Sequence, residues 1–189
     1  LPERFASYAE YQRHVGILME AGLIDDATRI WWDLRPSARF PTLETRIMDV
    51  CTRLEDTVAL ASLLMCIMRM LYRLRTRNQR WRIYTPMLIR ENRWRAMRYS
   101  FDEGLIDLAK GAVVPFVDLI DELCSLVAED ARALGCENEV AGVHNIISRG
   151  TSAHRQLKAY ELERASGASV EDSLKSVVDV LIQDTAHGL

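Results

Sequence analysis

Residues 31–49 read WWDLRPSARFPTLETRIMD and combine three arginines and three acidic residues with strand-forming side chains. Successive residues of a strand face opposite sides, so a strand from Thr42 onward places Glu44 and Arg46 next to each other on one face. Along such a strand the two residues lie about 7 Å apart. A carboxylate gives a divalent cation a hard oxygen ligand, and a guanidinium forks onto phosphate oxygens. The pattern therefore suits a cation with its bound phosphate, although an ion pair on an exposed strand is the default for any Glu-x-Arg.

Two prolines divide this stretch. Pro36 and Pro41 bracket a loop that carries Arg39, because proline donates no backbone hydrogen bond and fixes its own backbone angle. We predict one strand at residues 30–34 and a second at 42–49.

Arg35 and Arg39 flank the first part of this loop. Their planar, bidentate guanidinium groups suit a substrate carboxylate or an acyl phosphate. From position alone, ordinary surface arginines are an equally good interpretation.

The remainder of the chain predicts mainly helices. Apolar side chains recur at helical spacing, with capping residues at the starts and glycines at the ends. The predicted helices cover residues 7–21, 53–74, 86–98, 115–134, 137–148, 151–165 and 169–183, with an irregular or hairpin segment at 101–115. Thr52 and Glu55 form a capping box for the second of these helices. Strands followed by a helical layer indicate an α+β fold.

The helix predicted at 53–74 is apolar on nearly every face between Val58 and Met68. A helix that is apolar all round is buried all round, so we expect sheet, other helices or another chain to cover it. That apolar run is too short for a bilayer, which takes about 20 residues. Arginines crowd residues 69–82, which we interpret as a solvated helix end and loop rather than a nucleic-acid patch, because aromatic residues do not alternate with them.

The totals exclude other classes of protein. The chain has 189 residues, of which 49% are hydrophobic, which suffices for one domain with a core and excludes general disorder. A formal net charge of −3 makes no case for nucleic acid or membrane as a partner. The four cysteines form no Cys-x-x-Cys pair, so we expect reduced thiols in a cytoplasmic protein.

Three blocks carry a resemblance to a known family. They are WWDLRPSARFPTLETRIMDVCTR at residues 31–53, ENRWRA at 91–96 and GTSAHRQ at 150–156. In this order they resemble the bacterial carboxylate–amine ligases, the family of type 2 glutamate–cysteine ligases, which are related to glutamine synthetase. The resemblance covers nearly the whole chain and implies a glutamine-synthetase-like antiparallel sheet portion, with strands at about 30–49, backed by a mainly helical layer at about 53–185.

Family members are roughly twice as long, and the chain resembles only their C-terminal half. We therefore predict that residues 1–189 form the C-terminal half of a ligase catalytic domain. The glutamate-rich metal motif of the N-terminal half has no counterpart here. The chain starts at Leu1 rather than at methionine, as a processed chain or a fragment would. We expect part of an active site.

The resemblance also assigns roles to residues. It implies that Glu44 binds a Mg²⁺ ion bridging ATP phosphates, while Arg46 steadies the transferred phosphoryl group. Arg35 and Arg39 join Arg46 as candidate catalytic residues because of their place and chemistry. Three further arginines are candidates for contacts with substrate or phosphate, namely Arg93, Arg95 and Arg155.

The implied function is part of an ATP-dependent carboxylate–amine ligase. A glutamate-like carboxylate is phosphorylated to an acyl phosphate, and an amine acceptor then displaces phosphate to form an amide. The partners expected are these amino-acid substrates and either the N-terminal half on another chain or further copies of this chain. The alternative is a non-catalytic helical interaction or regulatory subunit derived from such an enzyme.

Overall fold

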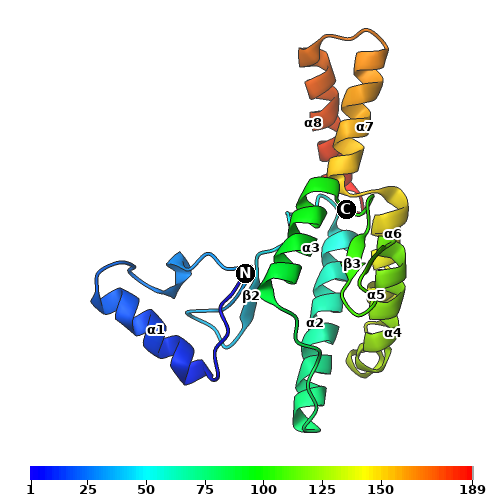
Figure 1. Cartoon of the computed structure of the whole chain (residues 1–189). Helices are drawn as coiled ribbons and strands as arrows, with labels where there is room; N and C mark the ends of the chain where they lie inside the picture. Colours follow the sequence, from blue (N-terminus) through cyan, green and yellow to red (C-terminus); the bar gives the residue numbers. More distant parts are fainter. Residues whose placement is uncertain (189) are drawn as a thin grey trace. The chain divides into compact units, whose positions relative to one another are not determined.

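The computed structural model describes residues 1–188 and separates into two compact units, which divide between Asp49 and Val50. The first unit contains α1 (Tyr8–Glu20), a short 3₁₀ helix, η1 (Ala27–Arg29), and the strands β1 (Leu34–Pro36) and β2 (Leu43–Thr45). Helices form most of the second unit, which adds one small hairpin, so the predicted α+β class is confirmed (Figure 1).

In the first unit, the predicted helix at 7–21 is confirmed, with the Ser7 hydroxyl accepting the backbone N–H of Glu10. β1 and β2 form an antiparallel pair in which Arg35 lies opposite Glu44. The loop between them carries Arg39, as the two prolines predicted.

The predicted strand boundaries were wrong. Residues 30–33 form no strand, and the first strand begins only at Leu34. The backbone carbonyls of Thr28 and Ile30 accept hydrogen bonds from the Arg35 side chain instead of from a neighbouring strand. β2 ends at Thr45 rather than Asp49, because its partner strand begins only at Leu34. The last backbone hydrogen bond between the two segments runs from the Arg46 N–H to the Asp33 carbonyl.

The second unit is built around α2 (Leu54–Thr76). The elements that follow are α3 (Pro86–Tyr99), β3 (Leu105–Asp107), β4 (Ala112–Val114), α4 (Phe116–Leu134), α5 (Glu137–Ala141), α6 (Val143–Arg149), α7 (Ser152–Ala165) and α8 (Val170–Ala186). β3 and β4 form the hairpin expected between residues 101 and 115. The core lies where α2 packs against α4, α5 and α6, and its largest contributors include Leu63, Met70 and Val127.

One predicted helix is divided. The segment predicted as a single helix at 137–148 forms α5 and α6, which meet at Gly142. A Cβ atom on Gly142 would lie 2.9 Å from the Glu139 carbonyl oxygen and 3.3 Å from the Ala59 Cβ on α2. Glycine therefore allows this turn to pack closely against the central helix.

The predicted capping box of α2 was also wrong. Arg53 occupies the N-cap position and makes no side-chain cap. The Thr52 hydroxyl instead accepts a hydrogen bond from Arg155, and Glu55 pairs with Arg53 and His187. These interactions of the two side chains replace the local cap.

α2 is buried on one face only, which corrects the expectation of burial all round within this chain. Ala59, Leu63 and Cys66 face the core, while Val58 and Met65 on the other face are exposed. Its 23 residues, with a mean hydropathy of 1.5 over the most apolar window, also match a membrane span in length and composition, and 28% of that window is buried. The core helix of a water-soluble domain passes the same test. An exposed apolar face of this kind is typical of a surface that contacts another protein or a membrane.

Candidate functional site

The residues singled out in the first unit meet on the β1–β2 hairpin. Arg35 Nε lies 2.8 Å from Glu44 Oε2, and Arg46 Nη2 lies 2.8 Å from Glu44 Oε1. Glu44 is therefore held between two guanidinium groups, and its side chain remains 38% exposed. The hydrogen bond from Arg35, followed by that from Arg46, lowers the pKa of Glu44. The carboxylate is thus ionised at neutral pH and accessible from solvent.

Arg35 has a scaffolding position in this cluster. Its side chain is 5% exposed, and its Nη1 donates to the carbonyls of Thr28 and Ile30 at 2.5 and 2.9 Å. These bonds join η1 and the residue that follows it to the hairpin. Arg35 therefore orients Glu44 while its own donors are largely engaged.

Arg46 and Arg39 are the more accessible cations. Arg46 lies 5.1 Å from the ring centroid of Trp31 and is 37% exposed. Arg39 is exposed in the β1–β2 loop, where the Ser37 hydroxyl accepts its backbone N–H, and it forms no ion pair with any of residues 1–188. The two arginines flank β2 at its opposite ends.

The cluster offers one carboxylate to a metal ion. No group of three or more His, Cys, Asp or Glu side chains within residues 1–188 is arranged to hold a metal. Mg²⁺ is commonly bound by one or two carboxylates together with substrate phosphates and water. Glu44 therefore fits the role of one ligand in a shared site, and further protein ligands would have to come from elsewhere.

The arginines predicted in the second unit belong to different places. On α3, Arg93 is half-buried, and Arg95 donates from Nη2 to the Glu103 carbonyl at 2.8 Å and from Nε to the Gly104 carbonyl at 3.3 Å. Arg95 thereby fastens α3 to the turn before β3. This geometry gives Arg95 a structural role within the unit.

Arg155 on α7 takes part in a separate charged cluster. Its Nη2 lies 2.5 Å from Asp184 Oδ2 and donates to Thr52, while Arg53 Nε bonds the other oxygen of Asp184 at 2.9 Å. The cluster ties α7, α8 and the start of α2 together. Arg155 Nε and Nη1 are buried without a hydrogen-bond partner among residues 1–188.

A buried pairing in the second unit was missed from the sequence. Asp130 on α4 is fully buried and is bound by Arg69 at 2.5 Å and by Arg73 at 2.7 Å. Both arginines belong to the segment interpreted as a solvated helix end. Their spacing of four residues, which places them on one face of α2, was the available signal.

Comparisons with known proteins place these features in a family. The model of glutamate-cysteine ligase family 2 matches residues 1–179. Among similar curated proteins, a Rhodospirillum rubrum protein is 58% identical over 189 residues, which are 100% of this chain and 49% of that protein. A Jannaschia protein is 53% identical over 184 residues, or 97% and 48% of the two chains. Both carry the provisional name glutamate–cysteine ligase 2.

The chain thus spans about half the length of the curated relatives it matches, in agreement with the predicted half-length relationship. The family match includes the hairpin with Arg35, Glu44 and Arg46 as well as the ENRWRA and GTSAHRQ blocks. On this evidence the chain belongs to the glutamate-cysteine ligase family 2.

Proposed function

We propose that this chain supplies part of the active site of an ATP-dependent carboxylate–amine ligase of the glutamate–cysteine type. The observation that supports the proposal is the accessible carboxylate of Glu44 between Arg35 and Arg46, on a hairpin inside the family match. The resemblance supplies the reaction class, and the cluster supplies groups of the required chemistry.

The reaction takes place in two steps. The substrate carboxylate attacks the γ-phosphorus of ATP, which forms an acyl phosphate and releases ADP. The amine then attacks the acyl carbon, so that an amide bond forms while inorganic phosphate and a proton leave. Mg²⁺, when bound, would neutralise charge on the phosphates.

Each charged residue of the hairpin has its own role in this reaction. The Arg46 guanidinium contacts the transferred phosphoryl group, whose charge is spread over its oxygens in the transition state. Glu44 would offer a carboxylate oxygen to the Mg²⁺ ion that binds the phosphates, and Arg35 holds Glu44 in place. Arg39, in the exposed loop, binds the substrate carboxylate.

The other half of the ligase would complete this site. On the two strands of the hairpin, as described within residues 1–188, Glu44 supplies the carboxylate, so we expect the remaining metal ligands from a polypeptide equivalent to the rest of the relatives. The exposed apolar face of α2, which includes Val58, Met65 and Tyr72, is a suitable surface for such a partner. The solvent-accessible surface of the chain is 13055 Å², which is more than the roughly 10,800 Å² expected for two separate compact units of these sizes. The chain therefore has surface available for contact with a partner.

The test begins with the native mass of the purified protein and the identity of each polypeptide in it. ADP release is then measured on that assembly with ATP, Mg²⁺ and amino-acid pairs. We expect Glu44→Gln and Arg46→Ala to lower ADP release at least 100-fold with unchanged helical content. Glu129→Gln is the matched control, because Glu129 is an exposed carboxylate that also pairs with arginines.

Turnover that is unchanged by Glu44→Gln and Arg46→Ala would remove both residues from the site. The competing function is a non-catalytic interaction or regulatory subunit, favoured by the observation that Arg95 and Arg155 are engaged inside the second unit. An assembly without ADP release under any amino-acid pair would support that function.

A further inference from the structure

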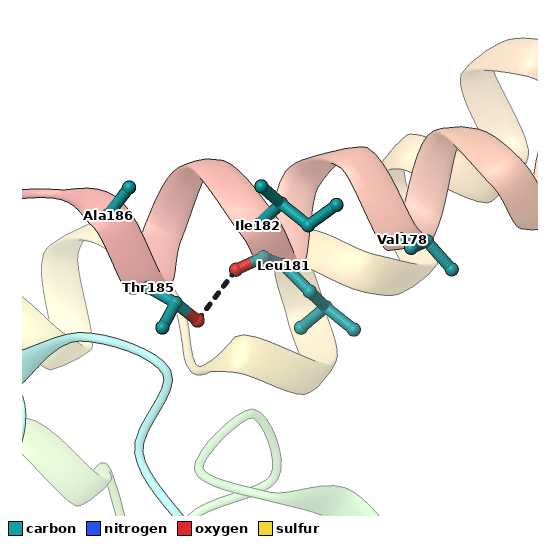
Figure 2. Close-up of a pocket in the computed structure, with 5 residues that line it drawn as sticks. All are labelled: Val178, Leu181, Ile182, Thr185 and Ala186. Carbon is teal, nitrogen blue, oxygen red and sulfur yellow. Dashed lines mark hydrogen bonds between the residues drawn. The ribbon is translucent and has the colours of Figure 1, made fainter.

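The solvent face of α8 carries an unusual stripe. Val170, Leu174, Val178 and Ile182 recur every four residues, and each is between 51% and 60% exposed. Leu181 lies half-buried beside them and helps to line a shallow hollow with Val178 and Ile182 (Figure 2). At the usual helical rise, the stripe from Val170 to Ile182 is about 18 Å long.

The amphipathic pattern of α8 is partly inverted. Its buried positions are Ser173 and Asp184, whereas Leu174 and Ile182 are more than half exposed. α8 packs mainly against α7, and this helical hairpin extends away from the core of the second unit (Figure 1). A surface helix normally turns its apolar stripe toward a packed neighbour. The aliphatic stripe of α8 therefore has no packed neighbour within the part of the chain that the structure describes, although apolar residues of this kind are normally buried.

The stripe is complementary to itself in the antiparallel direction. With Val178 placed opposite its own copy, Leu174 faces Ile182 and Val170 faces Ala186 of the second molecule. Lys175 and Asp179 lie four residues apart along one flank of the stripe, so the same alignment brings Lys175 of each copy near Asp179 of the other. Two-fold interfaces use the same patch on both subunits and require this kind of self-complementarity.

We propose that α8 packs antiparallel against α8 of a second copy of this chain, about a two-fold axis at Val178. The two α7–α8 hairpins then form a four-helix arrangement with the aliphatic stripe inside. Matched charges of opposite sign on the flank favour a second copy over an unrelated apolar surface, which would leave Lys175 and Asp179 without new partners. None of the residues of this α8 surface has a role in the ligase function proposed above.

The experiment is sedimentation equilibrium of the full chain over a range of concentrations. We expect a dimer, and Val178→Glu should raise its dissociation constant at least 100-fold because two carboxylates meet at the axis. Leu157→Glu is the matched control, since Leu157 is an aliphatic residue on α7 that is 61% exposed, compared with 53% for Val178. Circular dichroism should show unchanged helix content in both variants.

A charge exchange tests the alignment itself. Lys175→Glu and Asp179→Lys should each weaken the dimer about tenfold, and the double variant should recover it. Within one chain the double variant places a new carboxylate beside Glu171 and Asp172, the present partners of Lys175, so a merely local effect predicts no recovery. A wild-type monomer at 100 µM, a dimer unaffected by Val178→Glu, or an α8 covered instead by the other ligase half would overturn the proposal.

Discussion

Each unit of the molecule holds a carboxylate between two arginines, and the two clusters differ in burial. Glu44 lies between Arg35 and Arg46 on strands of three residues and is 38% exposed. Asp130 lies between Arg69 and Arg73 in the helical core and is fully buried. In both clusters the arginines lower the pKa of the carboxyl group.

Burial decides what each cluster can do. A buried carboxylate that loses its partners keeps the full cost of desolvation, so Asp130 is committed to joining α4 to α2. A partly exposed carboxylate can be rehydrated or bound by a ligand at small cost, since surface ion pairs contribute little to stability. The Glu44 cluster is therefore suited to binding, and the Asp130 cluster to folding.

The largest expected effect comes from breaking the buried cluster. Asp130→Asn removes the negative charge and leaves two guanidinium groups facing a neutral amide. We expect a loss of about 3–5 kcal/mol in the free energy of unfolding, the usual cost of removing one partner from a buried ion pair. Urea unfolding followed by circular dichroism measures it.

The neighbouring acid provides the control for this change. Glu129 is 57% exposed and pairs with Arg73 at 3.2 Å. Glu129→Gln should cost less than about 1 kcal/mol, as for other exposed ion pairs. Equal losses for the two variants would show that burial of the carboxylate does not determine how much these ion pairs stabilise the fold.

A second prediction separates the two arginines around Glu44. Arg35→Lys cannot keep both the bond to Glu44 and the bonds to the carbonyls of Thr28 and Ile30. We expect a loss of about 2 kcal/mol in local stability, or roughly 30-fold faster hydrogen exchange of residues 34–45. Exchange-mass spectrometry of the full chain measures this rate.

Arg46→Lys is the matched variant on the other side of Glu44. Lysine retains a positive charge and the solvent-exposed position, so exchange in residues 34–45 should remain within about threefold of wild type. If Arg46→Lys accelerates exchange as much as Arg35→Lys, the division into a scaffolding and an accessible arginine is wrong.

Local patterns were sufficient for most of the fold. Helices with strong caps and periodic apolar residues were predicted well: α1 behind Ser7 agrees to within a residue at each end, and α8 begins behind Ser169 as predicted but continues to Ala186. Predictions from local sequence patterns failed where a side chain interacts with a residue far away in the sequence. Thr52 follows the capping pattern but bonds Arg155, 103 residues away. The strand predicted at 30–34 failed for a nearer reason, because the Ile30 carbonyl accepts a hydrogen bond from the Arg35 side chain.

The candidate site was predictable only in part for the same reason. The pairing of Glu44 with Arg46 was expected from a spacing of two on one strand face, and the structure confirms their contact, although Arg46 lies one residue beyond the end of β2. The contact of Glu44 with Arg35 depends on the register of β1 against β2, which no local pattern specifies. Whether these residues catalyse a reaction stays a prediction for the assembled protein.

The smallest effect concerns acid pH and uses both clusters. A carboxyl group whose pKa is lowered by folding stabilises the protein above its unfolded pKa, and this contribution is lost as the pH falls through the folded value. Arg73 and then Arg69 lower the pKa of Asp130 in this way. We therefore expect the free energy of unfolding to decrease as the pH falls below about 4, the usual pKa of an aspartate.

The variants assign that decrease to one cluster. Asp130→Asn should flatten the pH dependence of unfolding below about pH 4, because the amide cannot take up a proton. Glu44→Gln should leave the curve close to wild type, since the lowered pKa of Glu44 belongs to a solvent-screened group. Urea titrations at a series of pH values compare the three proteins. A curve flattened by Glu44→Gln and not by Asp130→Asn would mean that the exposed hairpin, rather than the buried ion pairs of α2 and α4, limits stability in acid.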